Sequence, residues 1–355
     1  MILPKRTVFD DTATDCSGQP MFLGAPLGLH RYDRPQRPEF LELFKKQMNF
    51  FWRPERMDLT KDRPDFERLN PQERRVFTLN LQYQTAMDTV ITRGVSSLMP
   101  YVSLTEMEAA FNYWIFCENL HSYSYTYLLQ NATPDAGKIF DDALTNPEII
   151  KRGAAVKAEF DRLIAFEGDD PRKQILLTLL STQILEGVRF YGSFACAFAL
   201  AEPPRAKMEG NAKIVREICR DENVHVEITS TILNAMRTDP REGFMDVWEE
   251  CKPLAIEMFE VAAQEEIEWS KYLFSEGPIA NLDEARMIGF NKFITDLRLQ
   301  SIGLPAIFGQ KTNPIGWIDK WFDGHLVQVA PQETEVESYR TGSSVALGDL
   351  SNMIV

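Results

Sequence analysis

Two glutamate–histidine pairs carry residue types that could bind metal, Glu118-x-x-His121 and Glu222-x-x-His225. On a helix, residues three positions apart lie on neighbouring turns of one face, so each pair aims both side chains at one spot. Carboxylate and imidazole groups bind Fe(II) and Mn(II) readily, and the lack of a thiolate in the set argues against a structural zinc site. The pairs therefore suggest a metal centre of iron or manganese type.

Both pairs interrupt an apolar stripe of an amphipathic helix. The first stripe recurs at steps of three and four through Leu104, Met107, Phe111, Trp114, Glu118, His121, Tyr125 and Leu128. The second runs through Val215, Ile218, Glu222, His225, Thr229, Ile232 and Met236. Burying an unpaired carboxylate is costly, and a bound cation is the simplest compensation.

Each pair is also preceded by a predicted helix that has a single carboxylate among its apolar residues. Asp88 stands 30 residues before Glu118, and Glu186 stands 36 residues before Glu222. Two such helix pairs, closed face to face, make a four-helix bundle with the ligand set of di-iron and di-manganese carboxylate proteins. Four carboxylates would neutralise two divalent ions, with Glu118 and Glu222 as the natural bridges.

The competing interpretation is structural. A lone Glu-x-x-His on a helix is usually solvated or ion-paired, but here two of only four histidines belong to such pairs and both pairs lie on core stripes. Metal binding is therefore favoured. Tyr125, four residues after His121, shares its face, and the inward-facing Phe190, Phe194 and Ile218 could wrap its phenol in apolar surface. Spacing alone leaves open whether Tyr125 packs or is oxidised.

Almost no segment alternates with a period of two, so the sequence predicts an all-α fold. The helix that carries Glu118 and His121 is expected to start at a capping box of Ser103 and Glu106. The helix before it is expected to start at Asn70-Pro71 and to end at about Arg93, before Gly94. The other expected elements are an irregular arm over 1–35, helices over 38–50, within 137–167, from Pro171 to Pro203-Pro204, from Asn211, over 244–275 and over 282–302, and a disordered tail from about 330.

Composition narrows the class of protein. The formal net charge of −14 disfavours nucleic-acid and anionic membrane surfaces, which need clustered Lys and Arg. Five scattered cysteines without a C-x-x-C fit reduced thiols in a cytoplasmic protein. The N-terminus lacks the apolar core of a signal peptide, and the apolar run 190–201 is too short to cross a bilayer. We expect a soluble protein.

Long ordered segments give a more specific indication: GLHRYD, FFWRPE, YQTAMD, FCENLHSYSY, LEGVRFYGSFAC, MEGNAKIVREICRDENVH, NPIGW and VQVAPQETEVESY. Together they resemble the small (beta) subunit of class I ribonucleotide reductase of the tyrosyl-radical type. The resemblance spans nearly the whole chain. It implies a ferritin-like helical bundle, normally a homodimer, with an N-terminal arm (1–35), a di-metal helical domain (36–329) and a tail (330–355).

The resemblance also implies roles for single residues. The metal ligands would be Asp88, Glu118, His121, Glu186, Glu222 and His225. Tyr125 matches the radical-bearing tyrosine, and Phe190, Phe194 and Ile218 match its apolar pocket. Trp52 and Asp221 match the route for an electron and a proton between the surface and His121. Tyr339 matches the tail tyrosine that relays the radical, and Leu347–Val355 resembles the peptide that docks to the large subunit.

The implied chemistry is radical generation for deoxyribonucleotide synthesis. In this family two Fe(II) ions, with an external electron donor, react with dioxygen, and Tyr125 loses an electron and a proton. The radical then passes to a cysteine of the large (alpha) subunit, where a ribonucleoside diphosphate is reduced.

Asp88, where ferritins have Glu, favours the reductase, and the presence of Tyr125 argues against the Mn/Fe subclass. Fe/Fe against Mn/Mn stays open. The alternatives are a ferritin-like ferroxidase, a di-iron oxidase and a bundle without metal.

Overall fold

The computed structural model describes residues 7–322, and within that range the chain forms helices, turns and irregular segments, with two isolated β-bridges and no β-strand. This confirms the predicted all-α fold. The α-helices are α1 (Pro38–Asn49), α2 (Asp62–Arg68), α3 (Pro71–Leu98), α4 (Thr105–Ala132), α5 (Ala136–Ala143), α6 (Pro147–Ile164), α7 (Arg172–Ile184), α8 (Phe190–Ala201), α9 (Glu209–Thr238), α10 (Met245–Leu273), α11 (Glu284–Ser301) and α12 (Asp319–Phe322), and a π-helical turn, η3 (Leu185–Arg189), joins α7 to α8.

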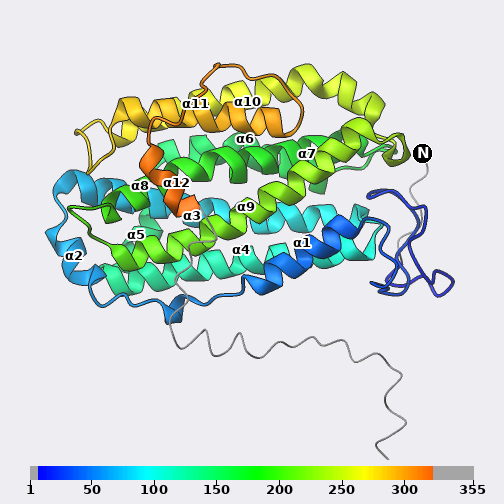
Figure 1. The fold of residues 1–355 in the computed structure, drawn as a ribbon, viewed down its shortest axis with the longest axis horizontal. Helices are drawn as coiled ribbons and strands as arrows, with labels where there is room; N and C mark the ends of the chain where they lie inside the picture. Colours follow the sequence, from blue (N-terminus) through cyan, green and yellow to red (C-terminus); the bar gives the residue numbers. More distant parts are fainter. Residues whose placement is uncertain (1–6, 323–355) are drawn as a thin grey trace, which may run out of the picture.

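Four long helical segments form the central bundle. They are α3, α4, α9 and the continuous α7–η3–α8 segment, which pack on one another across the core. The remaining helices cover the bundle from outside: α1 lies on α4 and α9, while α6, α10 and α11 pack on the α7–η3–α8 segment (Figure 1). The two predicted helix pairs, α3–α4 and α7/α8–α9, thus close against each other.

The segment from Arg172 to Ala201 has the length and hydropathy of a membrane span, and its most apolar window is entirely buried inside the fold. The continuous helix is longer than the apolar run 190–201 because α7, η3 and α8 join without a break. Its apolar surface packs against the bundle helices α3 and α9 and against the outer helices α6, α10 and α11, as in the central helix of a large core. All five cysteines are buried and free of disulfides.

The predicted end of α3 is wrong. The helix continues through Gly94 to Leu98. A Cβ at Gly94 would lie 2.3 Å from the ring of Phe160 on α6, far inside van der Waals contact. Gly94 therefore allows α3 and α6 to approach each other closely. In the sequence, a glycine with this role cannot be told from one that ends a helix.

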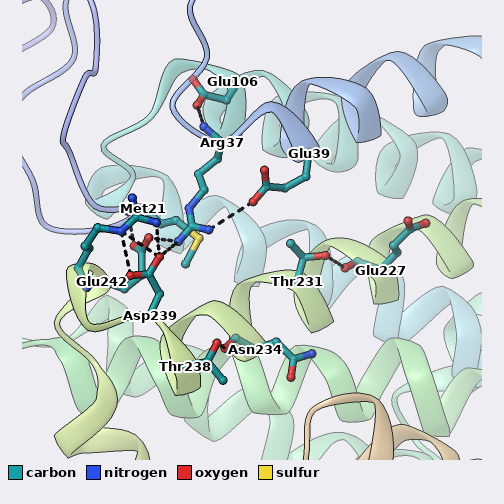
Figure 2. Close-up of polar contacts among 11 residues, drawn as sticks. Met21, Arg37, Glu39, Glu106, Glu227, Thr231, Asn234, Thr238, Asp239 and Glu242 are labelled. Carbon is teal, nitrogen blue, oxygen red and sulfur yellow. Dashed lines mark hydrogen bonds and ion pairs between the residues drawn. The ribbon is translucent and has the colours of Figure 1, made fainter.

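The predicted capping box of α4 is also wrong, because α4 begins at Thr105 without a side-chain cap and both residues of the expected box bind the chain that precedes α1. Ser103 Oγ accepts a hydrogen bond from the backbone N–H of Gly24 (2.6 Å), and Glu106 accepts one from the backbone N–H of Arg37 (2.7 Å). The Arg37 side chain in turn reaches Asp239 and Glu242 beyond the end of α9 (Figure 2). Ion pairs and hydrogen bonds thus fasten the chain before α1 to the bundle.

The predicted start of α9 at Asn211 is late by two residues, since the helix begins at Glu209. Its first backbone N–H groups are capped from another helix: Asp62 on α2 accepts from Gly210 (3.1 Å) and Asn211 (2.7 Å). Helix α2 had no counterpart among the predicted elements. It supplies the anion that a helix N-terminus favours and so fixes the start of a bundle helix.

Candidate metal centre

The six predicted ligand side chains meet in the middle of the bundle, and each is fully buried. Their donor atoms form two overlapping groups, in each of which all atoms lie within 4.8 Å of one another. One group comes from α4, η3 and α9, the other from α3 and α4. The members of the groups are Glu118, Glu186, Glu222 and His225, and Asp88, Glu118 and His121.

Two carboxylates reach both groups. Glu118 belongs to each of them, and its Oε1 lies 3.0 Å from Nδ1 of His225. Glu222 Oε1 lies 3.3 Å from Nδ1 of His121, and its Oε2 lies 3.4 Å from Nδ1 of His225. These are the two residues that the sequence predicts as bridges. Both imidazoles present Nδ1 to the carboxylates.

The unsatisfied atoms of this cluster fit a pair of divalent ions. Several donor atoms are buried without a hydrogen-bond partner in the described part of the chain, whereas buried polar groups are normally paired. The unpartnered ligand atoms on the inner side are both carboxylate oxygens of Asp88, Oε2 of Glu118 and of Glu186, Oε1 of Glu222 and Nδ1 of His121. Four carboxylates and two imidazoles match the charge and ligand preference of two Fe(II) or Mn(II) ions.

Burial and neighbouring charges shift the pKa values of the carboxyl groups in the cluster. Burial raises the pKa of Asp88 and of Glu186 well above the ordinary carboxyl range, and neighbouring carboxylates add to the shift. Burial also acts on Glu118, but the neighbouring imidazoles of His121 and His225 outweigh it and hold the pKa of Glu118 at about 2. Without bound cations, protons must therefore supply the positive charge.

One residue near the ligands was classed by sequence only as apolar core. Trp114, on α4, donates from Nε1 to Glu118 Oε1 and to Glu186 Oε1, both at 3.0 Å, and its ring stacks on His225 at 5.0 Å. It holds ligands from two helices and covers one imidazole. Its position four residues before Glu118 on the same face was the available signal.

Trp52, Asp221 and His121 form a continuous chain of contacts. The indole Nε1 of Trp52 donates to Asp221 Oδ2 (2.7 Å), and the same oxygen lies 3.2 Å from Nε2 of His121. The Trp52 and His121 rings are 6.4 Å apart and nearly parallel. Asp221 is itself buried. It contacts the imidazole of His121 on the side away from the cluster, as carboxylates do behind histidine ligands at many metal sites.

Tyr125 lies on the same face of α4 as His121 and is 1% exposed. Burial raises the pKa of its phenol well above 10, and the carboxylates of Asp88, Glu222 and Glu118 raise it further. Phe190, Phe194 and Ile218 are all buried in the same core. Their role as a pocket for Tyr125 stays a prediction, as do the roles of the six ligands.

The two tyrosines that flank Tyr125 lie in different surroundings. Tyr123 is about half exposed and donates to Glu55 (2.7 Å), and Tyr127 is partly buried. Tyr339, the docking segment 347–355 and the domain boundary at 329/330 lie outside the described residues.

Comparison with known proteins shows the family of this chain. The family model "Ribonucleotide reductase, small chain" matches residues 30–314. The beta subunit of ribonucleoside-diphosphate reductase 1 of Salmonella typhimurium is 40% identical, and the match covers 98% of each chain. The chain belongs to the ribonucleotide reductase small-chain family. The beta subunit of bacteriophage T4 is 33% identical over 94% of each chain, so the small-chain family also includes a viral relative of this length.

Solved structures agree with the small-chain fold. The R2 subunit of ribonucleotide reductase from Clostridium botulinum superposes with a TM-score of 0.81, covering 91% of this chain and 99% of that one at 22% identity. The Streptococcus sanguinis dimanganese(II)-NrdF superposes with a TM-score of 0.69, covering 82% and 98% at 19% identity. At these identities the likeness concerns the ferritin-like fold alone.

Metal uptake by this small chain should release protons. In the metal-free site burial raises the pKa of Asp88 and Glu186. Burial lowers the pKa of His121 and His225, but their neighbours outweigh it: Asp221, Glu118 and Glu222 raise the pKa of His121, and Cys117 together with Glu118 and Glu222 raises that of His225. Each ion must displace such protons, so the apparent affinity for Mn(II) should fall as the pH falls, roughly tenfold per pH unit for each proton released. Titration calorimetry in buffers of different ionisation enthalpy measures the release.

The matched control is Asp88→Asn, which removes one raised carboxyl and should release fewer protons. Binding of Mn(II) that releases no protons and keeps one affinity between about pH 6 and 8 would contradict this electrostatic description.

Proposed function

We propose that this small chain generates and stores a tyrosyl radical on Tyr125 for the reduction of ribonucleoside diphosphates. The supporting observation is the phenol of Tyr125, which is buried on α4 one turn after His121 and beside the carboxylate of Asp88. When bound by the six ligands, a pair of iron ions would supply an oxidant for one electron, formed with dioxygen. The rest of the chemistry depends on the surrounding residues.

Tyr125 provides the stored oxidising equivalent in this proposal. One electron leaves its ring, and its phenolic proton leaves toward the adjacent carboxylate cluster. Because the phenol is 1% exposed and sits in the apolar core, water and thiols do not reach the radical. Tyr123, by contrast, is about half exposed and would lose a radical to solvent reductants.

The chain Trp52–Asp221–His121 is the proposed connection between the cluster and the protein exterior. The indole N–H and the imidazole contact the same carboxylate oxygen, so a proton can move along hydrogen bonds while an electron moves between nearly parallel rings. Tyr339 and the tail would continue the route to a large subunit, to which segment 347–355 would dock. A homodimer and an external electron donor complete the proposed holoenzyme.

The direct test is iron loading. The metal-free protein is loaded anaerobically with Fe(II), exposed to oxygen and followed by electron paramagnetic resonance. Wild type should give a tyrosyl signal, and Tyr125→Phe should take up iron and give none. Tyr123→Phe, two residues away on the same helix, is the matched control and should keep the signal. Iron uptake without any tyrosyl signal in wild type would refute the radical role and favour an oxidase or a manganese cofactor.

A second test separates radical storage from radical transfer. Trp52→Phe, and truncation after Ala330, should both keep the Tyr125 signal and lose nearly all nucleotide reduction when the large subunit is added. Trp248→Phe, a buried tryptophan of α10 outside the route, is the control and should keep turnover. Full turnover by the truncated chain would contradict the proposed transfer route and favour a self-contained oxidase or ferroxidase.

A further inference from the structure

The turn that carries Glu186 is wider than the α-helix on either side of it. Over η3 the backbone is π-helical, and the N–H of Phe190 donates to the carbonyl of Leu185, five residues back instead of four. Such single π turns are frequent at functional sites. One residue of register corresponds to about 100° of rotation about a helix axis, so keeping this turn π-helical decides the direction in which Glu186 faces.

Arg298 of α11 binds the backbone next to this ligand. Its Nε donates to the carbonyl of Gly187 at 3.0 Å, and its guanidinium lies 4.7 Å from the ring centre of Tyr191. A Cβ at Gly187 would lie 3.1 Å from both Cδ and Nε of Arg298, tighter than ordinary contact. The glycine beside Glu186 therefore leaves the space in which the arginine reaches the helix backbone.

Arg152 of α6 binds the other end of the same turn. Its Nη2 donates to the carbonyl of Arg189 at 2.8 Å, and its Nε donates to Glu266 on α10 at 2.6 Å. The side chain is buried, and its guanidinium carbon lies 3.6 Å from the ring centre of Tyr83. Arg189 itself pairs with Glu265 of α10 at 2.5 Å. These contacts fasten the turn to the outer layer of the fold.

We propose that Arg298 and Arg152 are positioning residues for Glu186: from outside the four-helix bundle they bind carbonyls of the π turn and so hold the ligand toward the metal centre. Neither arginine belongs to the six ligands, and each acts through the backbone. The outer helices α6, α10 and α11 thereby contribute to the site. The inference rests on the metal centre of the proposed function and is independent of its radical step.

The test uses Co(II), which binds carboxylate and imidazole ligands and reports each site by visible spectroscopy. The metal-free full chain is titrated anaerobically. Arg298→Met should lower the affinity for one of the two Co(II) ions by about tenfold, the effect typical of losing a residue that supports a ligand, and leave the affinity for the other ion unchanged. Arg286→Met, an exposed arginine of the same helix α11, should leave both ions unchanged.

Two further variants address the same contact independently. Gly187→Ala places a methyl group against Arg298 and should reproduce the weakening, whereas Arg298→Lys keeps one donor and should recover part of the affinity. In the metal-free protein, Arg298→Met should also speed hydrogen exchange of the peptide 182–194. This readout requires neither metal nor activity.

The proposal is overturned if Arg298→Met and Gly187→Ala bind both Co(II) ions as wild type does with unchanged exchange. It is overturned equally if both ions weaken alike together with a lower melting temperature, which would show a merely structural role. A wild type that binds two Co(II) ions but forms no radical with iron would refute the radical function and leave this proposal standing. A wild type that binds no Co(II) would overturn both.

Discussion

The interior of the bundle contains more negative charge than a protein core tolerates without cations. Four buried carboxylates converge within a few ångströms, and burial together with mutual repulsion raises the pKa of Asp88 and Glu186. A buried charge is retained only where opposite charge or hydrogen bonds compensate it. Two divalent ions would neutralise the four carboxylates, and such a site would need surrounding groups that hold each side chain in one orientation.

Those surrounding groups come from every layer of the fold. Trp114 donates to two ligand carboxylates, Asp221 contacts the ligand His121 from behind, and Asp62 caps the helix that carries the second pair. Arg298 binds the π turn of Glu186 from outside the bundle. A reactive metal pair needs ligands held to within a fraction of an ångström, and supporting residues of this kind provide that precision. The outer helices therefore serve the site as well as stability.

The sequence predicts which six side chains come together in the core because helical period is a local property: residues three apart share a face whatever the tertiary structure. The same local reasoning failed where the role of a residue depends on a contact with a residue far away in the sequence. Gly94 accommodates Phe160 instead of ending α3, and Glu106 accepts from Arg37 instead of capping α4. The π turn 185–189 left no signal, because the segments on both sides of it, 175–184 and 190–201, are buried all round and give no helical period from which an inserted residue could be read.

The central claim is that two ions share one buried site between the helix pairs α3–α4 and α7/α8–α9. Anomalous diffraction from crystals of the protein grown with Mn(II) tests it most directly. The account predicts two peaks per chain about 3.5–4 Å apart, as in other two-metal sites, with Glu118 and Glu222 contacting both. A single peak, or none among these six side chains, would contradict it.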